Sequence, residues 1–420
     1  MTPRAVTPAP GPVYGQPTVP GSKSITNRAL LIAGLAEGTS TLSGALAADD
    51  SAAMIDAVRA LGASVVVSAD GTELVVEGVA GRLPANAIAL YARQAATVGR
   101  FLTAVAAASP VAITIDADPQ LRARPIKPLF DALVAMGARV TDTDGALPAT
   151  IIGPAHGGSI TVPAGISSQF ISALLIAGPL FGKGVQINID GAQVSAGYVA
   201  MTAAVMAKFA MSPALYPSAC AVQHGTYKAV GHYVIEPDAS AASYFFAAAA
   251  MTGGEVRVDG FGSPSTQADL RFVKILQEMG AVVAMGFHDV VVSGAPLRGV
   301  DVDMSDCSDM VPTLAVVAAT ASSPTTIRGV EFIRRKETDR VAVTVRELRK
   351  CGVGVDEHRD GMTIHPGARH GAVIDPEGDH RMVMAFAVLG LVTPGLAIDD
   401  PDCVAKTFPN FWDVLDSLLA

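Results

Sequence analysis

Aromatic side chains are scarce in this sequence. They make up 5% of its 420 residues, and charged residues make up only 16%. Half of the residues are nevertheless apolar, so alanine, valine, leucine and isoleucine must build the hydrophobic cores. This composition is typical of a well-packed soluble α/β protein and argues against disorder. The length indicates two domains rather than one core.

Cysteine is rare as well. Cys220, Cys307, Cys351 and Cys403 show no C-x-x-C spacing and no neighbouring histidine pair. We therefore expect four reduced cytosolic thiols rather than disulfides or a metal site.

Long hydrophobic segments are also missing. The N-terminal stretch MTPRAVTPAPGPVYG lacks the apolar core of a signal peptide. The most apolar runs, such as ISALLIAGPLFG, are too short to span a membrane. We expect a cytoplasmic protein with no membrane partner.

Positive charge is in deficit over the whole chain. With 30 basic and 39 acidic residues, the net charge is −9. Nucleic acid is therefore a poor candidate partner, because its binding depends on basic contacts with phosphates. Several lysines and arginines nevertheless stand at expected starts of loops or helices. Such local clusters in an acidic protein predict small anionic ligands.

A repeated unit is present along the whole chain. An amphipathic helix and a strand-like run recur in MIDAVRALGASVVV, PLFDALVAMGARVTD, DLRFVKILQEMGAVVA and VTVRELRKCGVGVDE, with a weaker copy in MTAAVMAKFAMSPAL. The helices end at Gly62, Gly137, Phe209, Gly280 and Gly352, which are 75, 72, 71 and 72 residues apart. Glycine followed by β-branched residues indicates a C-cap and a strand. Such units are common in α/β proteins, but the regular spacing favours six related ones.

The sixth copy is incomplete. Its helix, PNFWDVLDSLLA, ends the sequence before any strand, and the N-terminal stretch PGPVYGQPTVP has no other obvious place. We expect this stretch to supply the missing strand. The sequence thus predicts two α/β domains of three units each: residues 20–232, and residues 233–420 completed by residues 1–19. Two connections at one place predict a hinge and a cleft between the domains.

Polar and basic residues gather where apolar helices are expected to begin. Lys23, Ser24 and Arg28 in VPGSKSITNRAL stand in the first turns of one helix. Free N–H groups and cations at such a position can bind an anion. A capped helix with a solvated lysine is the alternative.

Hydroxyl groups mark two further helix starts. Ser167, Ser168 and Gln169 in AGISSQF precede a very apolar helix, and Ser195 and Tyr198 in VSAGY occupy a similar place. Hydroxyls and free N–H groups together favour a phosphate ligand. Plain capping by a pair of serines is the alternative.

Ionisable residues take these places in the second half. Lys336 and Arg340 in IRRKETDR are expected to share a helix face, with Glu337 beside them. A carboxylate flanked by cations keeps a low pKa unless it is buried, and a buried one is a candidate for proton transfer. Other charged starts hold Asp309 in SDCSDM, His380 and Arg381 in GDHRM, Lys406 in AKTFPNFW and, in the first half, Arg124 in RARPI. Carboxylate capping and solvated helix faces are the alternatives.

Together these motifs resemble the 5-enolpyruvylshikimate-3-phosphate synthase family. The matching stretches are PGSKSITNRAL, RARPI, SSQF, VSAGY, EPDASAASYFFAAAA, RRKETDR, GDHRM and AKTFP, in the family's order. The resemblance implies two domains, each of three βαβαββ units in an inside-out α/β barrel. It implies transfer of the enolpyruvyl group of phosphoenolpyruvate to the 5-hydroxyl of shikimate 3-phosphate, through a tetrahedral intermediate and with release of phosphate, in aromatic amino acid biosynthesis. It implies no cofactor, and we expect a monomer.

The resemblance also assigns residues to the two substrates. Shikimate 3-phosphate is expected at Lys23, Ser24, Arg28, Ser167, Ser168, Gln169, Ser195, Tyr198, Asp309 and Lys336. Phosphoenolpyruvate is expected at Lys23, Ala96, Arg124, Gln169, Arg340, Arg381 and Lys406. We expect Asp309 to accept the hydroxyl proton and Glu337 to transfer a proton at the methylene carbon. Lys23 would share in proton transfer or stabilise charge.

Two stretches depart from the family pattern. Phe332 stands four residues before Lys336, where an asparagine is common, so one substrate contact is in question. In QAATVGR, Ala96 replaces a glycine that borders phosphoenolpyruvate and the longer herbicide glyphosate in the family. Since an added methyl group hinders a longer ligand more, the resemblance predicts that glyphosate is a weak inhibitor.

Two other functions stay open on the sequence alone. The sister transferase that acts on UDP-N-acetylglucosamine typically uses a loop cysteine. No cysteine lies between Lys23 and Ser167 here, and SSQF favours the shikimate enzyme. A non-catalytic anion- or RNA-binding repeat protein is disfavoured by the acidic charge and the few aromatic residues.

Overall fold

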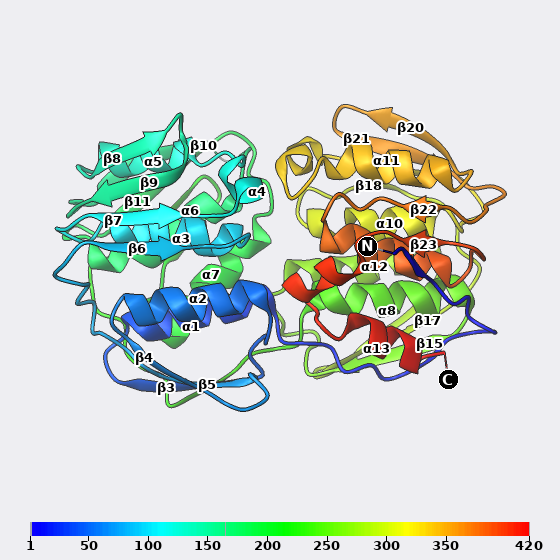
Figure 1. Cartoon of the computed structure of the whole chain (residues 1–420), viewed down its shortest axis with the longest axis horizontal. Coiled ribbons are helices and arrows are strands. Elements are labelled where there is room, and N and C mark those ends of the chain that lie inside the picture. The colour runs from blue at the N-terminus through cyan, green and yellow to red at the C-terminus, as the bar shows by residue number, and fades with distance from the viewer. Residues whose placement is uncertain (1, 164, 420) are drawn as a thin grey trace. The chain divides into compact units, whose positions relative to one another are not determined.

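The structure, a computed structural model, describes residues 2–163 and 165–419. The chain forms two compact units (Figure 1). The N-terminal unit is Gly21–Ile235, and the C-terminal unit joins Met1–Pro20 to Glu236–Ala420. Each unit encloses its own hydrophobic core, built mainly from aliphatic side chains. No helix in the described ranges is long and apolar enough to cross a membrane.

The N-terminal unit contains three four-stranded sheets with one pattern of pairing. In each, the first two strands are parallel and the remaining pairs are antiparallel. In spatial order the strands are β14 (His232–Val234), β3 (Thr39–Ser43), β5 (Glu73–Glu77) and β4 (Ser64–Val67); β6 (Ile88–Tyr91), β7 (Ile113–Asp116), β9 (Ala146–Ile152) and β8 (Arg139–Thr143); and β10 (Gly158–Pro163), β11 (Val185–Asp190), β13 (Ala219–Val222) and β12 (Ala214–Tyr216).

The C-terminal unit repeats this pattern in two four-stranded sheets and one three-stranded sheet. The strands in spatial order are β2 (Tyr14–Gly15), β15 (Glu255–Asp259), β17 (Asp289–Ser293) and β16 (Val282–Met285); β18 (Asp301–Asp303), β19 (Thr325–Arg328), β21 (Gly361–His365) and β20 (Gly354–His358); and β22 (Val373–Ile374), β23 (Ala397–Ile398) and β1 (Arg4–Ala5). The predicted α/β fold of βαβαββ units is confirmed. Each sheet of the described residues is open, so none closes into a barrel by itself.

The N-terminal segment differs from our expectation in its detail. It supplies two strands rather than one. Tyr14–Gly15, within the stretch expected to complete the sixth unit, pairs in parallel with β15 of the fourth. The sixth sheet is completed by Arg4–Ala5, which pairs antiparallel with β23 (Figure 1).

The end of the N-terminal unit lies slightly later than predicted. His232–Val234 form β14, which pairs in parallel with β3, so these residues belong to the N-terminal unit up to Ile235. Sheet pairing thus moves the boundary by three residues, because β14 supplies the first strand of a sheet whose other strands come early in the chain.

Six helices are buried on almost all sides, and each is the first helix of one of the six repeated βαβαββ units. Apart from polar residues in their first two turns, such as Arg28 and Arg100, their sequences are apolar around the helix, as ASAASYFFAAAAMT illustrates, and such helices belong inside a core. They are α1 (Lys23–Leu35), α3 (Ala96–Ala106), α6 (Ser168–Ala177), α8 (Ala239–Thr252), α10 (Val311–Ala318) and α12 (His380–Gly390). We call them the inner helices.

Six outer helices each have an exposed face. They are α2 (Asp49–Ala60), α5 (Lys127–Ala135), α7 (Gly197–Lys208), α9 (Arg271–Met279), α11 (Arg340–Lys350) and α13 (Phe411–Ser417). These are the helices of the repeat found in the sequence. Short helical turns are α4 (Pro119–Arg122), η1 (Gly178–Leu180), η2 (Ala268–Leu270), η3 (Ser308–Met310), η4 (Glu331–Arg335) and η5 (Pro401–Lys406).

The helix end predicted at Phe209 is confirmed as the C-cap of α7, but the left-handed turn follows one residue later. After α2 and α5 the chain turns at Gly62 and Gly137, with φ of 105° and 97°. After α7 the left-handed residue is Ala210, with φ of 65°, and not Phe209. Phe209 is fully buried, so its side chain serves the core rather than the turn.

Candidate active site

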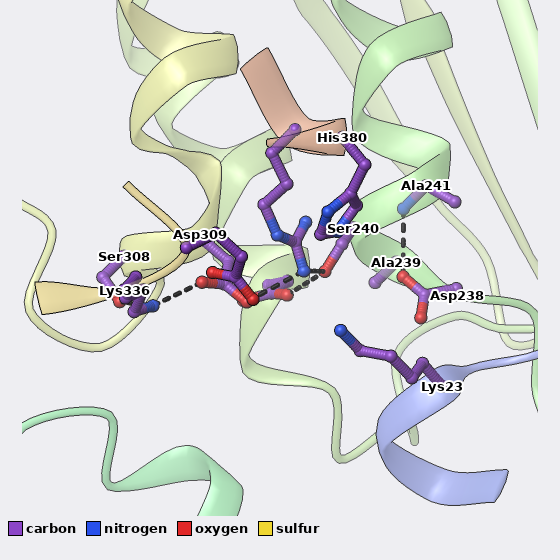
Figure 2. Close-up of polar contacts among 12 residues, drawn as sticks. Lys23, Asp238, Ala239, Ser240, Ala241, Ser308, Asp309, Lys336 and His380 are labelled. Carbon is purple, nitrogen blue, oxygen red and sulfur yellow. Dashed lines mark hydrogen bonds and ion pairs between the residues drawn. The ribbon is translucent and has the colours of Figure 1, made fainter. Parts of the chain in front are cut away.

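The C-terminal unit gathers its charged residues around the carboxylate of Asp309. Lys336 and Arg340 both contact Asp309 Oδ1, and the Arg340 Nη1 distance is 2.9 Å. Arg381 Nη2 lies 2.8 Å from Asp309 Oδ2. Figure 2 shows Asp309 between Lys336 and Ser240. Three segments of the chain thus meet at one carboxylate.

Helix starts bring these residues together. Asp309 lies in η3, which leads into α10, while Arg340 is the first residue of α11 and Arg381 the second of α12. Asp379 caps α12 and accepts a hydrogen bond from the Arg381 N–H over 2.9 Å. The expected shared helix face of Lys336 and Arg340 is wrong, because Lys336 lies in the turn before α11.

Opposing effects act on the pKa of Asp309. Burial raises it, but Arg381, Lys336 and Arg340 together hold the pKa well below its usual value. Burial lowers the pKa of Lys336, and the neighbouring Asp309 opposes this effect. The carboxylate is therefore ionised and firmly paired at neutral pH, as a buried charge must be.

Arg340 joins three carboxylates. Its guanidinium contacts Asp309, lies 2.8 Å from Glu337 Oε2 and is 2.7 Å from Asp379 Oδ2. Burial lowers the pKa of Arg340, but these carboxylates raise it further above its ordinary value. Glu337 Oε1 in turn lies 3.2 Å from Lys406 Nζ. The structure therefore links Asp309 and Glu337 through one shared arginine.

Phe332 has a definite place beside this cluster. Its ring centroid lies 5.7 Å from Lys336 Nζ, a cation–π distance. Lys336 also donates to the Ser308 hydroxyl over 3.2 Å. An aromatic face thus stands where the resemblance implies an asparagine.

In the N-terminal unit, Ser167 and Gln169 contact Arg100, which is not among the predicted site residues. Ser167 caps α6 and accepts a hydrogen bond from Gln169 N–H. Arg100 donates to Ser167 Oγ over 3.2 Å and to Gln169 Oε1 over 2.7 Å. Gln169 Nε2 reaches Thr97 over 3.4 Å. An arginine inside the apolar start of α3 was the sequence signal for this contact.

Arg28 is buried among polar groups of three helices. It is 1% exposed and donates to Thr202 Oγ1, Ser172 Oγ and the Ser24 carbonyl. Its guanidinium carbon lies 5.1 Å from the centroid of the Phe101 ring. Burial lowers its pKa to about 10. In this structure Arg28 ties α1 to α6 and α7.

The remaining predicted residues of this unit also lie near helix starts. Lys23 opens α1 and forms an ion pair with Asp50 over 3.4 Å. Ala96 is buried as the first residue of α3. Ser168 opens α6, Ser195 and Tyr198 lie at the start of α7, and Arg124 lies between α4 and α5.

Metal ligands do not form a site in the described part of the chain. No group of three or more His, Cys, Asp or Glu side chains there is arranged to hold a metal ion.

Comparison with known proteins decides the family. The sequence model of EPSP synthase (3-phosphoshikimate 1-carboxyvinyltransferase) matches residues 8–415. The chain belongs to the EPSP synthase family. The predicted membership is confirmed, and the chain is a transferase, which sets aside the non-catalytic alternative.

Curated relatives in the EPSP synthase family match almost the whole chain. The 3-phosphoshikimate 1-carboxyvinyltransferase of Trichormus variabilis is 42% identical over 406 residues, covering 96% of this chain and 95% of the relative. That of Methanosphaerula palustris is 42% identical over 412 residues, covering 96% and 97%.

Solved structures agree with this placement. EPSP synthase from Acinetobacter baumannii has a TM-score of 0.83 at 26% identity and covers 99% of this chain and 98% of its own. The enolpyruvyl transferase NikO from Streptomyces tendae shares the fold, with a TM-score of 0.77 at 16% identity over 99% and 97% of the two chains.

Proposed function

We propose that this chain transfers the enolpyruvyl group of phosphoenolpyruvate to the 5-hydroxyl of shikimate 3-phosphate and releases phosphate. The observation that carries the proposal is the Asp309 carboxylate, held by Lys336, Arg340 and Arg381. Cations at helix starts suit the phosphate and carboxylate groups of both substrates. The family membership supports the same reaction.

Asp309 is the base for the acceptor hydroxyl in this proposal. Alone with its three cations it is a weak base, because its pKa lies well below the usual value. When phosphoenolpyruvate binds Arg340 and Arg381, its negative charge offsets theirs and the pKa of Asp309 rises. Substrate binding thus prepares the carboxylate to accept the 5-hydroxyl proton as that oxygen attacks.

Glu337 serves the methylene carbon of phosphoenolpyruvate. Protonation of that carbon makes the neighbouring carbon electrophilic, and attack by the hydroxyl gives a tetrahedral intermediate. The intermediate then loses phosphate and a methyl proton. Glu337, paired with Arg340 and Lys406, gives this proton when it is itself protonated and takes it back from the methyl group, while the phosphate leaves with the proton that Asp309 accepted. Lys23 shares in proton transfer or stabilises the developing charge.

The N-terminal unit supplies hydroxyl and amide groups for the acceptor. We assign Ser167, Ser168 and Gln169, with Ser195 and Tyr198, to shikimate 3-phosphate. Arg100 joins this set, because it holds both Ser167 and Gln169. Arg28 acts from behind them through Ser172 and Thr202. Arg124 stays assigned to phosphoenolpyruvate.

The deciding experiment measures phosphate release from phosphoenolpyruvate with shikimate 3-phosphate, with UDP-N-acetylglucosamine and with no acceptor. We expect release only with shikimate 3-phosphate. Release with the UDP-sugar alone would assign the chain to the sister reaction, and no acceptor-dependent release would contradict the proposal.

We also propose that Ala96 weakens inhibition by glyphosate. Its backbone is helical, so the position does not require glycine, and its methyl group lies at the buried start of α3. A misplaced methyl group in a tight site costs about 1–3 kcal/mol, or about ten- to a hundred-fold in affinity. Phosphoenolpyruvate is shorter and loses less.

Ala96→Gly tests this second proposal. The inhibition constant for glyphosate should fall about ten-fold or more, while KM for phosphoenolpyruvate changes less. Ala95→Gly is the matched control, because it removes a buried methyl group from the neighbouring residue. Equally tight inhibition of the wild type and Ala96→Gly would contradict the proposal.

A further inference from the structure

A buried carboxylate without a role in the proposed reaction lies beside the Asp309 cluster. Asp269, in η2, is 5% exposed. Its Oδ2 accepts a hydrogen bond from the hydroxyl of Ser240, the second residue of the inner helix α8. Burying a carboxylate is unfavourable, so its presence here calls for a physical reason.

Ser240 connects Asp269 to Arg381. Arg381 Nη2 donates to Ser240 Oγ over 3.4 Å and to Asp309 Oδ2 over 2.8 Å. A serine hydroxyl has one proton to donate. Because that proton points to Asp269, the lone pairs of Oγ are left for the guanidinium. Figure 2 shows Ser240 and Asp309 turned towards the same space.

We propose that Asp269 is a positioning residue for Arg381, which it holds through Ser240 in the orientation that binds phosphoenolpyruvate. Ionised Asp269 can only accept a hydrogen bond, so it fixes the Ser240 proton. Protonated Asp269 can donate to Ser240 instead, and the Ser240 proton then turns towards Arg381, which is also a donor. The restraint on Arg381 is lost in that state. The inference rests on the proposed function, in which Arg381 binds phosphoenolpyruvate.

The surroundings of Asp269 raise its pKa, so its protonation occurs near neutral pH. Burial and then Asp309 raise the pKa of Asp269 to about 6, with a further increase from Asp238, although Arg381 and Ser240 act in the opposite direction. Cys307 is also nearby, but burial raises the pKa of its thiol to about 12, so it stays neutral. Asp309 stays ionised at pH 6, because its own pKa is well below the usual value.

The test compares pH profiles of wild type and Asp269→Asn between pH 5 and 8. At pH 7.5 the variant should have the higher KM for phosphoenolpyruvate, with a smaller change in kcat. At pH 5 the two should converge, since a group with a pKa of about 6 is then mostly protonated. The substrate phosphates titrate near pH 6 as well, but their effect cancels in the ratio of variant to wild type. A constant ratio across this range overturns the proposal.

Two further variants sharpen the comparison. Ser240→Ala cuts the link and should raise KM at pH 7.5 as Asp269→Asn does. Asp301→Asn also removes one aspartate charge from the C-terminal unit, but Asp301 is exposed and pairs with Arg328. The KM of this variant for phosphoenolpyruvate should equal that of the wild type at every pH. An unchanged KM in Ser240→Ala would contradict the proposed link.

A second measurement needs no turnover. The folded pKa of Asp269 lies above its unfolded value, so its contribution to stability is complete below the unfolded pKa and is lost as pH rises through about 6. The wild type should therefore lose stability to unfolding relative to Asp269→Asn between pH 5 and pH 7.5. A constant difference would show that Asp269 does not titrate there and would overturn the inference. Absence of acceptor-dependent phosphate release by wild type would instead contradict the proposed function, whatever the unfolding result.

Discussion

The two units share one architecture but carry different chemistry at their helix starts. In the C-terminal unit, Asp309, Arg340 and Arg381 form ion pairs with distances of 2.8–2.9 Å. In the N-terminal unit, Arg100 and Arg28 bind hydroxyl, amide and carbonyl groups instead. The same helix geometry therefore supports an ionic cluster in one unit and a mainly neutral hydrogen-bonding surface in the other.

This difference follows from what each set has to do in the proposed reaction. Neutral donors and acceptors discriminate between ligands by their hydroxyl groups, because a ligand that lacks one of these groups leaves a buried protein group without a hydrogen-bond partner. Paired charges create a strong local electric field, and an anionic substrate can replace the carboxylates as the partner of the cations. Two ion pairs within the N-terminal unit, Lys23 with Asp50 and Lys127 with Asp131, depart from this contrast.

The largest expected effect comes from removing the charge of Asp309. Asp309→Asn keeps the size of the side chain but cannot accept the 5-hydroxyl proton. We expect kcat to fall about a thousand-fold, within the usual range for a general base. Binding of shikimate 3-phosphate, measured by calorimetry, should change much less. Retention of wild-type kcat would exclude Asp309 as the base.

The next effect contrasts the two buried arginines. Arg340→Met leaves Asp379 buried without its ionic partner, and breaking a buried pair in this way costs about 3–5 kcal/mol. Arg28→Met removes a charge whose hydrogen bonds go to neutral groups, and Thr202 still donates to Ser172 over 2.8 Å. We expect a cost of about 1–2 kcal/mol there.

Unfolding in urea measures this contrast. Trp412 is the single tryptophan and lies in the C-terminal unit, so its fluorescence reports on Arg340→Met. Circular dichroism reports on both units and serves for Arg28→Met. Equal losses of stability in the two variants would show that ionic and neutral partners contribute equally to the free energy of unfolding.

The smallest expected effect concerns the start of α3. A Cβ at Gly99 would lie 3.4–3.6 Å from side-chain atoms of Ala92, Leu147 and Leu121, which is ordinary contact. Alanine is favoured over glycine within a helix by about 1 kcal/mol. Gly99→Ala should therefore raise the thermal midpoint slightly and leave kcat unchanged. A lower midpoint would show that the core around α3 cannot accept a methyl group.

Prediction from the sequence worked best where a local pattern carries the information. The outer helices have an apolar face, so their periodicity and their terminal glycines marked the repeat. At α7 the pattern is weak: Phe209 caps the helix, and no glycine marks the left-handed turn at Ala210. The two-residue strands β1 and β2 have no pattern of their own, because their pairing depends on β23 and β15.

The candidate site divides in the same way. Asp309, Glu337, Arg340 and Arg381 could be chosen because each is polar at the start of a helix or beside one. Asp269 stands in a short turn with no such signal, and only packing brings it to Ser240.

The family, the order of the repeated units and the residue types at the helix starts follow from the sequence, since these depend on short motifs and local periodicity. Which charges meet depends on the packing of distant segments. Arg381 and Asp309 lie 72 positions apart, and Asp269 reaches Arg381 through Ser240. Such contacts arise because the inner helices are mostly apolar around their axes, so packing in the core sets where their first turns lie.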